Sequence, residues 1–342
     1  DAEAKANRRP AERDIRVEDA LAVDPLEIEL GVALIQLADS KQGGDLLDRI
    51  HRVRHKIAGE IGIVMPKVRI RDNMRLEPNQ FRVKIADIPV AQNEAQPHSL
   101  LAVTSDQTAG TTEGHPANDS VFGNRARWIK PEQKREAKSR GYAIVEPGDV
   151  LATHLAEICR RHADELLTRD ATKHLLDELR TSSPAVVDEI IPGVLSLAEV
   201  QTILQLLLRE QVSIRQLGLI LEALGDFASR SKDPILLTEC VRHRLARQIS
   251  KRYCDSENRL HAITLHQTLE ELISDGITRN EEGFVVKMPP HETESLCEQL
   301  GTEIKKLTAK SHPPIVLVSP QLRPAVKTIT ANELPHLIVL GT

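Results

Sequence analysis

The chain has 342 residues and a mass of 38.0 kDa. A chain of this length is too long for a single ordinary hydrophobic core, so two to four compact units are expected. Hydrophobic residues make up 40% and charged residues 28%, which is typical of a soluble globular protein, and a net charge of −5 argues against a nucleic-acid footprint. The four cysteines lie far apart in the sequence, which indicates reduced thiols and no zinc site. The sequence contains no run of 18 apolar residues, so no membrane span is predicted.

The chain begins with a segment that has the composition of a linker. Residues 1–24 are highly charged and show no core pattern. Alternating apolar and acidic residues in PLEIELGVALIQL (25–37) then predict a half-buried strand. Gly31 lies inside this strand, where a bulge or a close backbone approach is expected. Glu27 and Glu29 face its polar side, and the sequence predicts no partner that would shift their pKa.

A helix and two further strands follow. Residues 46–61 repeat apolar side chains at intervals of three and four, which predicts one helical stripe. The segments 68–72 and 80–87 alternate again, and we expect them to pair with each other. Residues 25–97 are therefore predicted to form a strand–helix–strand–strand α+β unit.

Residues 98–146 have few apolar side chains and read as a small insertion. A short strand (LLAVT), a turn-rich stretch, a charged helix that ends at Gly141 and a second strand (YAIVE) are predicted. The stretch HPANDSVFGNRARWI (115–129) holds Phe122 and the only tryptophan, Trp128, of a chain with seven aromatic residues. Phe122 either fills a local minicore or is left for a partner to bury, and the residues alone leave both alternatives open.

The next part of the chain is predicted to be helical. Residues 147–168 carry a strong helical stripe, and helices continue from 170 to about 252. Three helix starts carry capping signals, namely Ser196 three residues before Glu199, Ser213 three residues before Gln216, and Asp233 before Pro234.

The last part changes period once more. LHAITL, PIVLVS and HLIVL are short apolar strands, and three helical segments lie between them. Alternating strands and helices predict an α/β unit over 253–342.

Motifs of catalysis are absent from the sequence. There is no phosphate loop, GxSxG, HExxH or GxGxxG. His51 and His55 lie four apart on a helix, but no further ligands complete a metal set, so a surface face is favoured. His154 and His162 lie eight apart on the helix 147–168, where packing or capping is favoured over catalysis. We therefore expect no enzyme activity, no cofactor and no metal.

The order of several segments resembles the FlhA family of flagellar type III export-gate proteins. The segments include PLEIELGVALIQL, RIRDNM, TAGT, NDSVFG, RWI, ATHL and IIPGVLSLAEV, and the resemblance covers 24–342. It implies the cytoplasmic portion of a membrane protein at the inner face of the bacterial inner membrane, without its transmembrane region. It also implies a nine-subunit ring and a chain that normally runs a little beyond Thr342.

The family layout implies an α+β multidomain protein. An α/β first subdomain carries an inserted small α/β subdomain, and a helical third and an α/β fourth subdomain follow. The corresponding boundaries in this sequence are a linker at 1–24, a first subdomain at 25–97 and 147–166, a second at 98–146, a third at 167–252 and a fourth at 253–342.

The resemblance also implies a site. Export chaperones with their substrates would dock in a cleft between the first and second subdomains, and the substrates would pass to the membrane pore. Asp119, Phe122 and Thr153 match family positions important for that docking, and Gly31 matches a glycine linked to the function of the first subdomain. The resemblance shifts the interpretation of Phe122 towards a partner-contacting ring, with an apolar floor from the start of the helix 147–168. Ser120 and Val121 replace the proline and alanine often found in this loop.

Further partners implied by the family are the export ATPase complex, other export-gate membrane proteins and a second copy of the chain. Nucleic acid is not expected. Reorientation of the subdomains would release the bound cargo. Two other interpretations remain open: the equivalent subunit of a virulence type III system, and a purely structural ring component.

Overall fold

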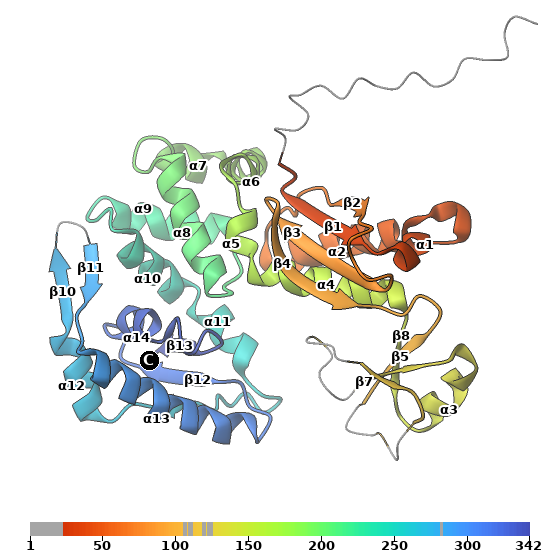
Figure 1. Cartoon of the computed structure of the whole chain (residues 1–342). Helices are drawn as coiled ribbons and strands as arrows, with labels where there is room; N and C mark the ends of the chain where they lie inside the picture. The colour runs from red at the N-terminus through yellow and green to blue at the C-terminus, as the bar shows by residue number, and fades with distance from the viewer. Residues whose placement is uncertain (1–22, 105–107, 109–111, 118–120, 122–125, 281–282) are drawn as a thin grey trace, which may run out of the picture. The chain divides into compact units, whose positions relative to one another are not determined.

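A computed structural model describes residues 23–342, apart from 105–107, 109–111, 118–120, 122–125 and 281–282 (Figure 1). The described residues form two compact units, 23–56 with 65–159 and 57–64 with 160–342. The predicted subdomain boundaries are finer than this division and stay predictions. No helix in the described part of the chain combines the length and apolar character that crossing a membrane requires.

The first sheet of the first unit has the strand order β2-β1-β3-β4. Its strands are β1 (Leu26–Leu30), β2 (Arg69–Asp72), β3 (Gln80–Ile85) and β4 (Ile88–Glu94). β1 pairs with β2 in parallel and with β3 in antiparallel register, so the predicted pairing of 68–72 with 80–87 is wrong. β4 was not predicted; it follows β3 through a tight turn in which Ala86 and Asp87 have positive φ angles of 48° and 64°.

The charges on β1 explain why this strand lies in the centre. Glu27 and Glu29 are only 3% and 7% exposed, and buried carboxylates need cationic partners. Those partners come from both sides, because β2 carries Arg71 and β3 carries Arg82 and Lys84. A direct β2–β3 pairing would leave one flank of the acidic strand without cations. The prediction that these glutamates lack partners is therefore wrong.

The predicted strand 25–37 is shorter than expected. It ends at Leu30, and η2 (Val32–Leu34), α1 (Ile35–Ala38) and η3 (Ser40–Gln42) follow. The helical stripe over 46–61 is confirmed as α2 (Leu46–Ile61), with all five stripe residues buried.

The second sheet of the first unit has the order β6-β7-β5-β8. Its elements are β5 (Leu100–Val103), β6 (His115–Ala117), β7 (Ala126–Ile129), η4 (Pro131–Gln133), α3 (Lys134–Ser139) and β8 (Ala143–Val145). The expected shortage of apolar residues is confirmed for the described residues. The core cluster consists of Ala102, Ile129, Ala137 and Tyr142, with Leu100 and Ile144 packed against it, and Leu101 and Trp128 are further large buried residues of these strands.

The predicted helix 147–168 is interrupted. α4 (Pro147–Arg161) ends one residue before His162, and α5 (Ala163–Leu166) begins one residue after it. His154 and His162 therefore share no helix face. His154 is buried against the ring of Phe81, as the packing interpretation predicted, whereas Nδ1 of His162 lies 2.8 Å from a carboxylate oxygen of Glu165.

The helical part of the second unit agrees with the sequence in most respects. It comprises α6 (Arg169–Ser182), α7 (Pro184–Ile190), α8 (Leu197–Arg209), α9 (Leu217–Ala228), α10 (Pro234–Arg244) and α11 (Ala246–Tyr253). Ser196 and Glu199 form the predicted capping box of α8, and the Asp233 carboxylate caps α10. The capping box at Ser213 is wrong, because α9 begins only after Gln216 and the Ser213 hydroxyl donates to the carbonyl of Ile61.

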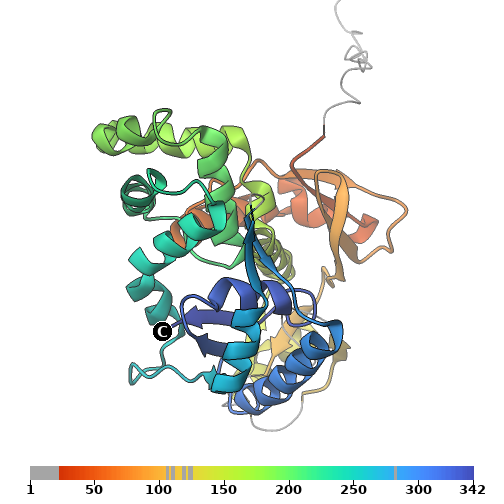
Figure 2. The same cartoon turned by 90° about the vertical axis from the view of Figure 1, so that its left-hand side faces the viewer.

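The C-terminal part of the second unit is the predicted α/β unit. A parallel sheet of order β13-β12-β9 lies between α13 and α14 (Figures 1 and 2). Its elements are β9 (Ile263–Thr264), α12 (Gln267–Asp275), α13 (Pro290–Thr308), β12 (Ile315–Val318), α14 (Arg323–Thr330) and β13 (Ile338–Gly341). The hairpin of β10 (Ile277–Asn280) and β11 (Gly283–Val286) was not predicted.

A buried charge cluster joins the helical and α/β parts of the second unit. Arg323 at the start of α14 makes hydrogen bonds of 2.6 and 3.0 Å to the carboxylate of Glu210 and one of 2.7 Å to Glu239. Nη1 of Arg242 lies 3.1 Å from Glu210, and Nη2 donates to the Val339 carbonyl of β13 at 3.3 Å. The cluster therefore holds α8, α10, α14 and β13 together.

The two glutamates of this cluster differ in their ionisation. Burial raises the pKa of both, but the charges of Arg242 and Arg323 outweigh burial at Glu210, whose pKa is lowered. At Glu239 burial outweighs the attraction of Arg323, and the neighbouring charge of Glu210 adds to it, so the pKa of Glu239 is raised.

Candidate functional site

A groove of about 460 Å³ lies between the two sheets of the first unit. One wall is β4 with the segment that follows it, and the other is β6 with the facing part of β7. Among the strands that the structure describes, β4 and β6 lie at the edges of their sheets, so each has one side without a described strand partner. Edge strands can pair with an added strand of another chain, which makes such a groove suitable for a peptide or for an element of a partner protein.

The lining of the groove is mainly neutral and hydrogen-bonding. Four side-chain amides line it, those of Gln80, Gln92, Asn93 and Gln96. The other lining residues are Glu94, His115, Pro116, Ala117 and Trp128. All four amides contact polar groups of neighbouring residues, and those of Gln92 and Gln96 accept hydrogen bonds from neighbouring side chains. Arg82 donates two hydrogen bonds of 3.0 and 3.1 Å to the Gln92 carbonyl oxygen, and Asn79 donates to the Gln96 carbonyl oxygen at 3.1 Å. Oriented amides can recognise a partner by hydrogen bonding without carrying charge.

Trp128 supplies the large apolar surface of the groove. It lies in β7, opposite Leu101 of β5 and His115 of β6, and is 7% exposed. The aromatic residue is therefore largely packed into the sheet and offers only part of its surface to the groove. This placement accounts for a tryptophan in a polar stretch of sequence.

The predicted contact residues Asp119 and Phe122 lie outside the described residues, so their role stays a prediction. The nearest described residue of the groove wall in sequence is Ala117, two positions before Asp119. The chain order therefore places the predicted loop directly after one wall of the groove.

Thr153 is half-buried on α4, and its hydroxyl donates to the Asp149 carbonyl at 2.7 Å. The neighbouring His154 is 3% exposed, and its Nε2 lies 3.3 Å from Nδ2 of Asn93, a groove residue. The apolar floor expected from the start of this helix is wrong, because Val150, Leu151 and Leu155 are at most 2% exposed. These side chains are used to fill the core, and the contact between α4 and the groove is the polar one through His154.

Gly31 is required by a close backbone approach. Its φ of −65° is ordinary, but a Cβ atom would lie 2.2 Å from the Glu77 carbonyl oxygen and 2.7 Å from that of Pro78. Its N–H donates to the Gln80 carbonyl at 2.8 Å. The expectation of a close approach is confirmed, and the contact fixes the start of β3, where Gln80 lines the groove.

The carboxylates of Glu27 and Glu29 on β1 stabilise the first sheet, to which the groove strand β4 also belongs. Glu29 accepts hydrogen bonds from Lys84 at 2.6 Å and from Asn73 at 2.9 Å, and Glu27 lies 2.9 Å from Nε of Arg71. Burial alone would raise the pKa of Glu29, but the hydrogen bonds and the charges of Lys84 and Arg82 outweigh it, so that pKa is lowered. The Glu29 contact raises the pKa of Lys84. We call this set of residues the glutamate ladder.

No cluster of three metal-ligating side chains occurs among the residues that the structure describes. His51 and His55 contact each other, with ring nitrogens 3.3 Å apart and rings edge to face. The amides of the groove were missed in the sequence because isolated glutamines and asparagines carry no motif. The clue that could have identified them is their concentration in QNEAQ (92–96), after an alternating strand.

The fold is that of a multidomain α+β protein with a small sheet inserted into its first part, as predicted. A family model described as the FHIPEP family matches residues 1–342. The chain therefore belongs to the FHIPEP family.

The chain is also similar to a curated flagellar protein. It is 39% identical over 321 residues to the flagellar biosynthesis protein FlhA of Bacillus subtilis strain 168, which covers 94% of this chain and 47% of that protein. The chain thus spans about half the length of the curated relatives it matches. The resemblance to the FlhA family is confirmed.

Two solved structures share the fold. The Chlamydia pneumoniae CdsV and CdsO protein complex contains a chain with a TM-score of 0.81 and 22% identity, with 94% of each chain covered. Nonameric SctV-C of EPEC gives a TM-score of 0.74 at 21% identity, again with 94% of each chain covered. At these identities the likeness shows the fold alone, and it confirms the predicted fold class.

Proposed function

We propose that this chain is the docking platform of a flagellar type III protein export gate, at the cytoplasmic face of the bacterial inner membrane. It binds export chaperone–substrate complexes in the amide-lined groove and hands the substrates to the membrane pore. The observation that carries the proposal is the groove itself, since it joins two sheet edges, oriented amides and one tryptophan surface. This combination suits a folded or extended protein partner.

The relatives favour the flagellar system over a virulence system. Identity to the flagellar protein of Bacillus subtilis is 39%, against 22% to the CdsV chain. A virulence export gate is the second candidate, because the same fold occurs in CdsV. A purely structural ring component is the third, and it would leave the groove without a partner.

The remaining partners are proposed by analogy with these proteins. The CdsV structure contains the protein CdsO, which supports an export-associated partner such as a component of the export ATPase complex. The nonameric SctV-C supports self-association into a ring. Other export-gate membrane proteins complete the set, and we propose that the chain binds and releases cargo without acting as an enzyme or binding nucleic acid.

Asp119 and Phe122 are proposed as rim and anchor of the groove, next to the wall at Ala117. Thr153 acts from α4, beside the His154–Asn93 contact. Gly31 acts on the groove through Gln80 and does not touch the partner.

The test is titration calorimetry of a cognate chaperone–substrate complex into the chain. Three proteins are compared with the unchanged chain: Phe122→Ala, the groove variant Gln92→Ala with Gln96→Ala, and the control Gln267→Ala with Gln299→Ala on the second unit. Because each removed anchor or hydrogen bond contributes about 1 kcal/mol or more, we expect the first two to bind about tenfold more weakly. The control removes the same number of side-chain amides outside the groove and should bind normally.

Melting curves of the same proteins separate binding from folding. A Phe122→Ala protein that melts early but binds normally would assign the ring to a minicore. Normal binding by both Phe122→Ala and the groove variant would reject the groove as the docking site.

A further inference from the structure

A second cavity lies wholly within the second unit, away from the residues of the groove. It has a volume of about 660 Å³. The ends of α2 and α4, the loop between α8 and α9, and α11 line it. A volume of this size is in the range of natural ligand sites.

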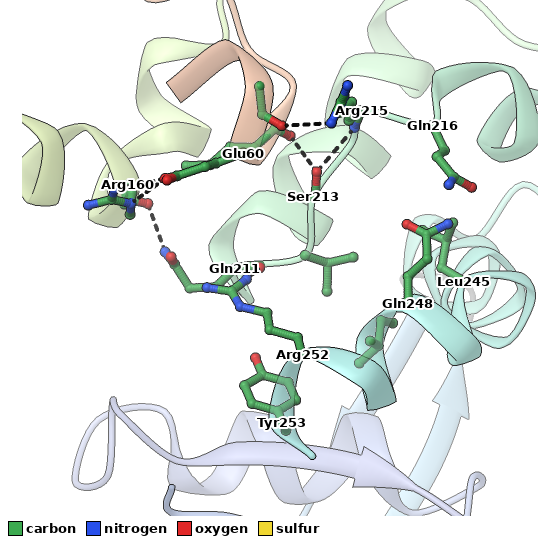
Figure 3. A pocket seen from close by; sticks show the side chains of 14 residues that line it. Glu60, Arg160, Gln211, Ser213, Arg215, Gln216, Leu245, Gln248, Arg252 and Tyr253 are labelled. Carbon is green, nitrogen blue, oxygen red and sulfur yellow. Dashed lines mark hydrogen bonds and ion pairs between the residues drawn. The ribbon is translucent and has the colours of Figure 1, made fainter. Parts of the chain in front are cut away.

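Three arginines from three different elements surround this cavity. Arg160 lies in the last turn of α4, on the same side of the cavity as the guanidinium of Arg252 from α11. Arg215, from the loop before α9, lies above both (Figure 3). Glu60 is the single acidic residue among the lining residues, and it accepts bonds of 2.7 and 3.1 Å from Arg160. The lining therefore carries an excess of positive charge, although the net charge of the chain is −5.

Arg215 and Arg252 are held in place by neutral groups. Arg215 donates to the Gly59 carbonyl at 3.2 Å, and Arg252 donates to the Gln211 carbonyl. Neither guanidinium forms an ion pair with any carboxylate in the part of the chain that the structure describes. A carbonyl positions a guanidinium without neutralising it, and each guanidinium has five N–H donors, so donors and charge remain for a ligand.

The negative ends of the nearby helices are already covered. The carbonyl oxygens of Gly59 and Ile61, at the end of α2, accept bonds from Arg215 and Ser213. The carbonyl of Arg160, at the end of α4, accepts a bond of 2.7 Å from the Gln211 side chain. These contacts satisfy the carbonyl groups that would otherwise repel an anion.

The neutral part of the lining suits a peptide more than a bare ion. Gln216 and Gln248 lie on the side of the cavity opposite Arg160 and Arg252 (Figure 3). Ile249 and Tyr253 of α11 supply accessible apolar surface, since both line the cavity and are half-buried. Amides can bind a peptide backbone, and the apolar residues can contact an aliphatic side chain between two acidic ones.

We propose that this cavity binds an acidic peptide segment of a partner protein, with carboxylates held by Arg215 and Arg252 and an apolar side chain over Ile249 and Tyr253. Arginine binds carboxylates through two parallel hydrogen bonds, which gives direction as well as charge attraction. The site is separate from the groove, so either can fail without the other.

The test uses a fluorescein-labelled, end-capped peptide of sequence EELEE and its neutral counterpart QQLQQ. Fluorescence anisotropy is measured with the whole chain, with Arg215→Gln plus Arg252→Gln, and with the control Arg230→Gln plus Arg247→Gln. The control arginines are exposed, lie on the second unit outside the cavity, and remove the same charge. We expect EELEE to bind at least tenfold more weakly to the first variant, and within twofold of normal to the control.

Further arms identify the contact. Arg215→Lys keeps the charge but loses the paired donors, so binding should weaken with unchanged melting. Raising the salt concentration from about 50 to about 300 mM should weaken EELEE binding, because it screens exposed charges. If the double variant melts early, Arg215→Lys alone decides the assignment.

Four results would overturn the proposal. They are equal loss of binding in both double variants, equal binding of QQLQQ, no EELEE binding up to about 1 mM, and displacement of EELEE by inorganic phosphate at the same concentration of negative charge. The last result would assign the cavity to small anions. Normal binding by Arg215→Lys would show that paired hydrogen bonds from Arg215 do not contribute and that only unspecific charge attraction holds the peptide.

Discussion

In the glutamate ladder, two nearly buried carboxylates face cations whose side chains stay 20% to 49% exposed, those of Lys84, Arg82 and Arg71. In the charge cluster of the second unit, Glu210 and Glu239 face Arg323 and Arg242, which are only 5% and 8% exposed. The ladder therefore buries its carboxylates and leaves its cations partly exposed, whereas the cluster buries its arginines, and its carboxylates Glu210 and Glu239 are 16% and 20% exposed.

This difference decides how each set responds to change. An exposed cation that loses its partner is solvated again, but a buried charge that loses its partner stays in a poorly polar environment. The ladder should therefore tolerate the loss of a carboxylate better than the cluster tolerates the loss of an arginine. The cluster links elements from α8 to β13, so its failure would spread over the second unit.

Arg323→Met should have the largest effect of the changes considered. It removes the guanidinium that contacts both Glu210 and Glu239 and leaves two buried carboxylates with Arg242 alone, at a cost of about 3–5 kcal/mol. Urea unfolding monitored by circular dichroism measures the loss. Arg244→Met is the control, because its pairing with Asp226 is exposed and should be worth less than about 1 kcal/mol. Equal losses for the two variants would contradict the comparison.

Gly31→Ala should have the next largest effect, because it acts on the backbone that follows the ladder strand. The added Cβ would meet carbonyl oxygens at 2.2 and 2.7 Å, so the loop before β3 must move, at a cost of about 2–3 kcal/mol. The same movement shifts Gln80 and should weaken cargo binding. In Gly301→Ala the nearest atom is 3.8 Å away in the middle of α13, so a gain of roughly 0.5–1 kcal/mol is expected. Thermal melting of both proteins checks the contrast, and an unchanged Gly31→Ala protein would reject the close-approach argument.

The smallest effect is a difference in the pH dependence of stability. The pKa of Glu29 is lowered on folding, so its ionised form stabilises the fold at neutral pH, and this contribution is lost as pH falls through the folded pKa. The pKa of Glu239 is raised, so acidification protonates it more readily in the folded chain and adds stability. Relative to the unchanged chain, Glu29→Gln should lose less stability on acidification and Glu239→Gln should lose more.

Urea unfolding at several pH values between about 7 and 4 measures both slopes. Slopes that change in the same direction for the two variants would show that the two sets of glutamates do not differ in this way.

Elements with strong local signals were predictable from the sequence. The stripe of α2, the capping box at Ser196 and the proline start of α10 each depend on residues a few positions apart. The strand order around β1 was not predictable in the same way. It depends on which distant strand supplies cations to Glu27 and Glu29, which is a contact of tertiary structure.

The candidate site shows the same limit. Gly31 was identified as a close approach, and the structure adds that its partners are the carbonyls before β3. The groove amides were not identified, because their role comes from the meeting of two sheet edges. The false capping box at Ser213 has a similar cause, since its hydroxyl is used by the carbonyl of Ile61, 152 positions away.

The small core of the second sheet has a consequence for the docking proposed at the groove. Besides Leu101 and Trp128, the core of this sheet is one cluster of four buried residues among those described, two of them alanines, so it contributes less free energy against local opening than the core of the first sheet. This sheet should therefore exchange its amide hydrogens faster than the first sheet, which is stabilised by Phe81 and the ladder. The wall of the groove at β4 then belongs to a stable sheet, and the wall at β6 and β7 belongs to a sheet that opens more readily. Partners of different shape could therefore bind at one site, and each would lose free energy in ordering the less stable wall.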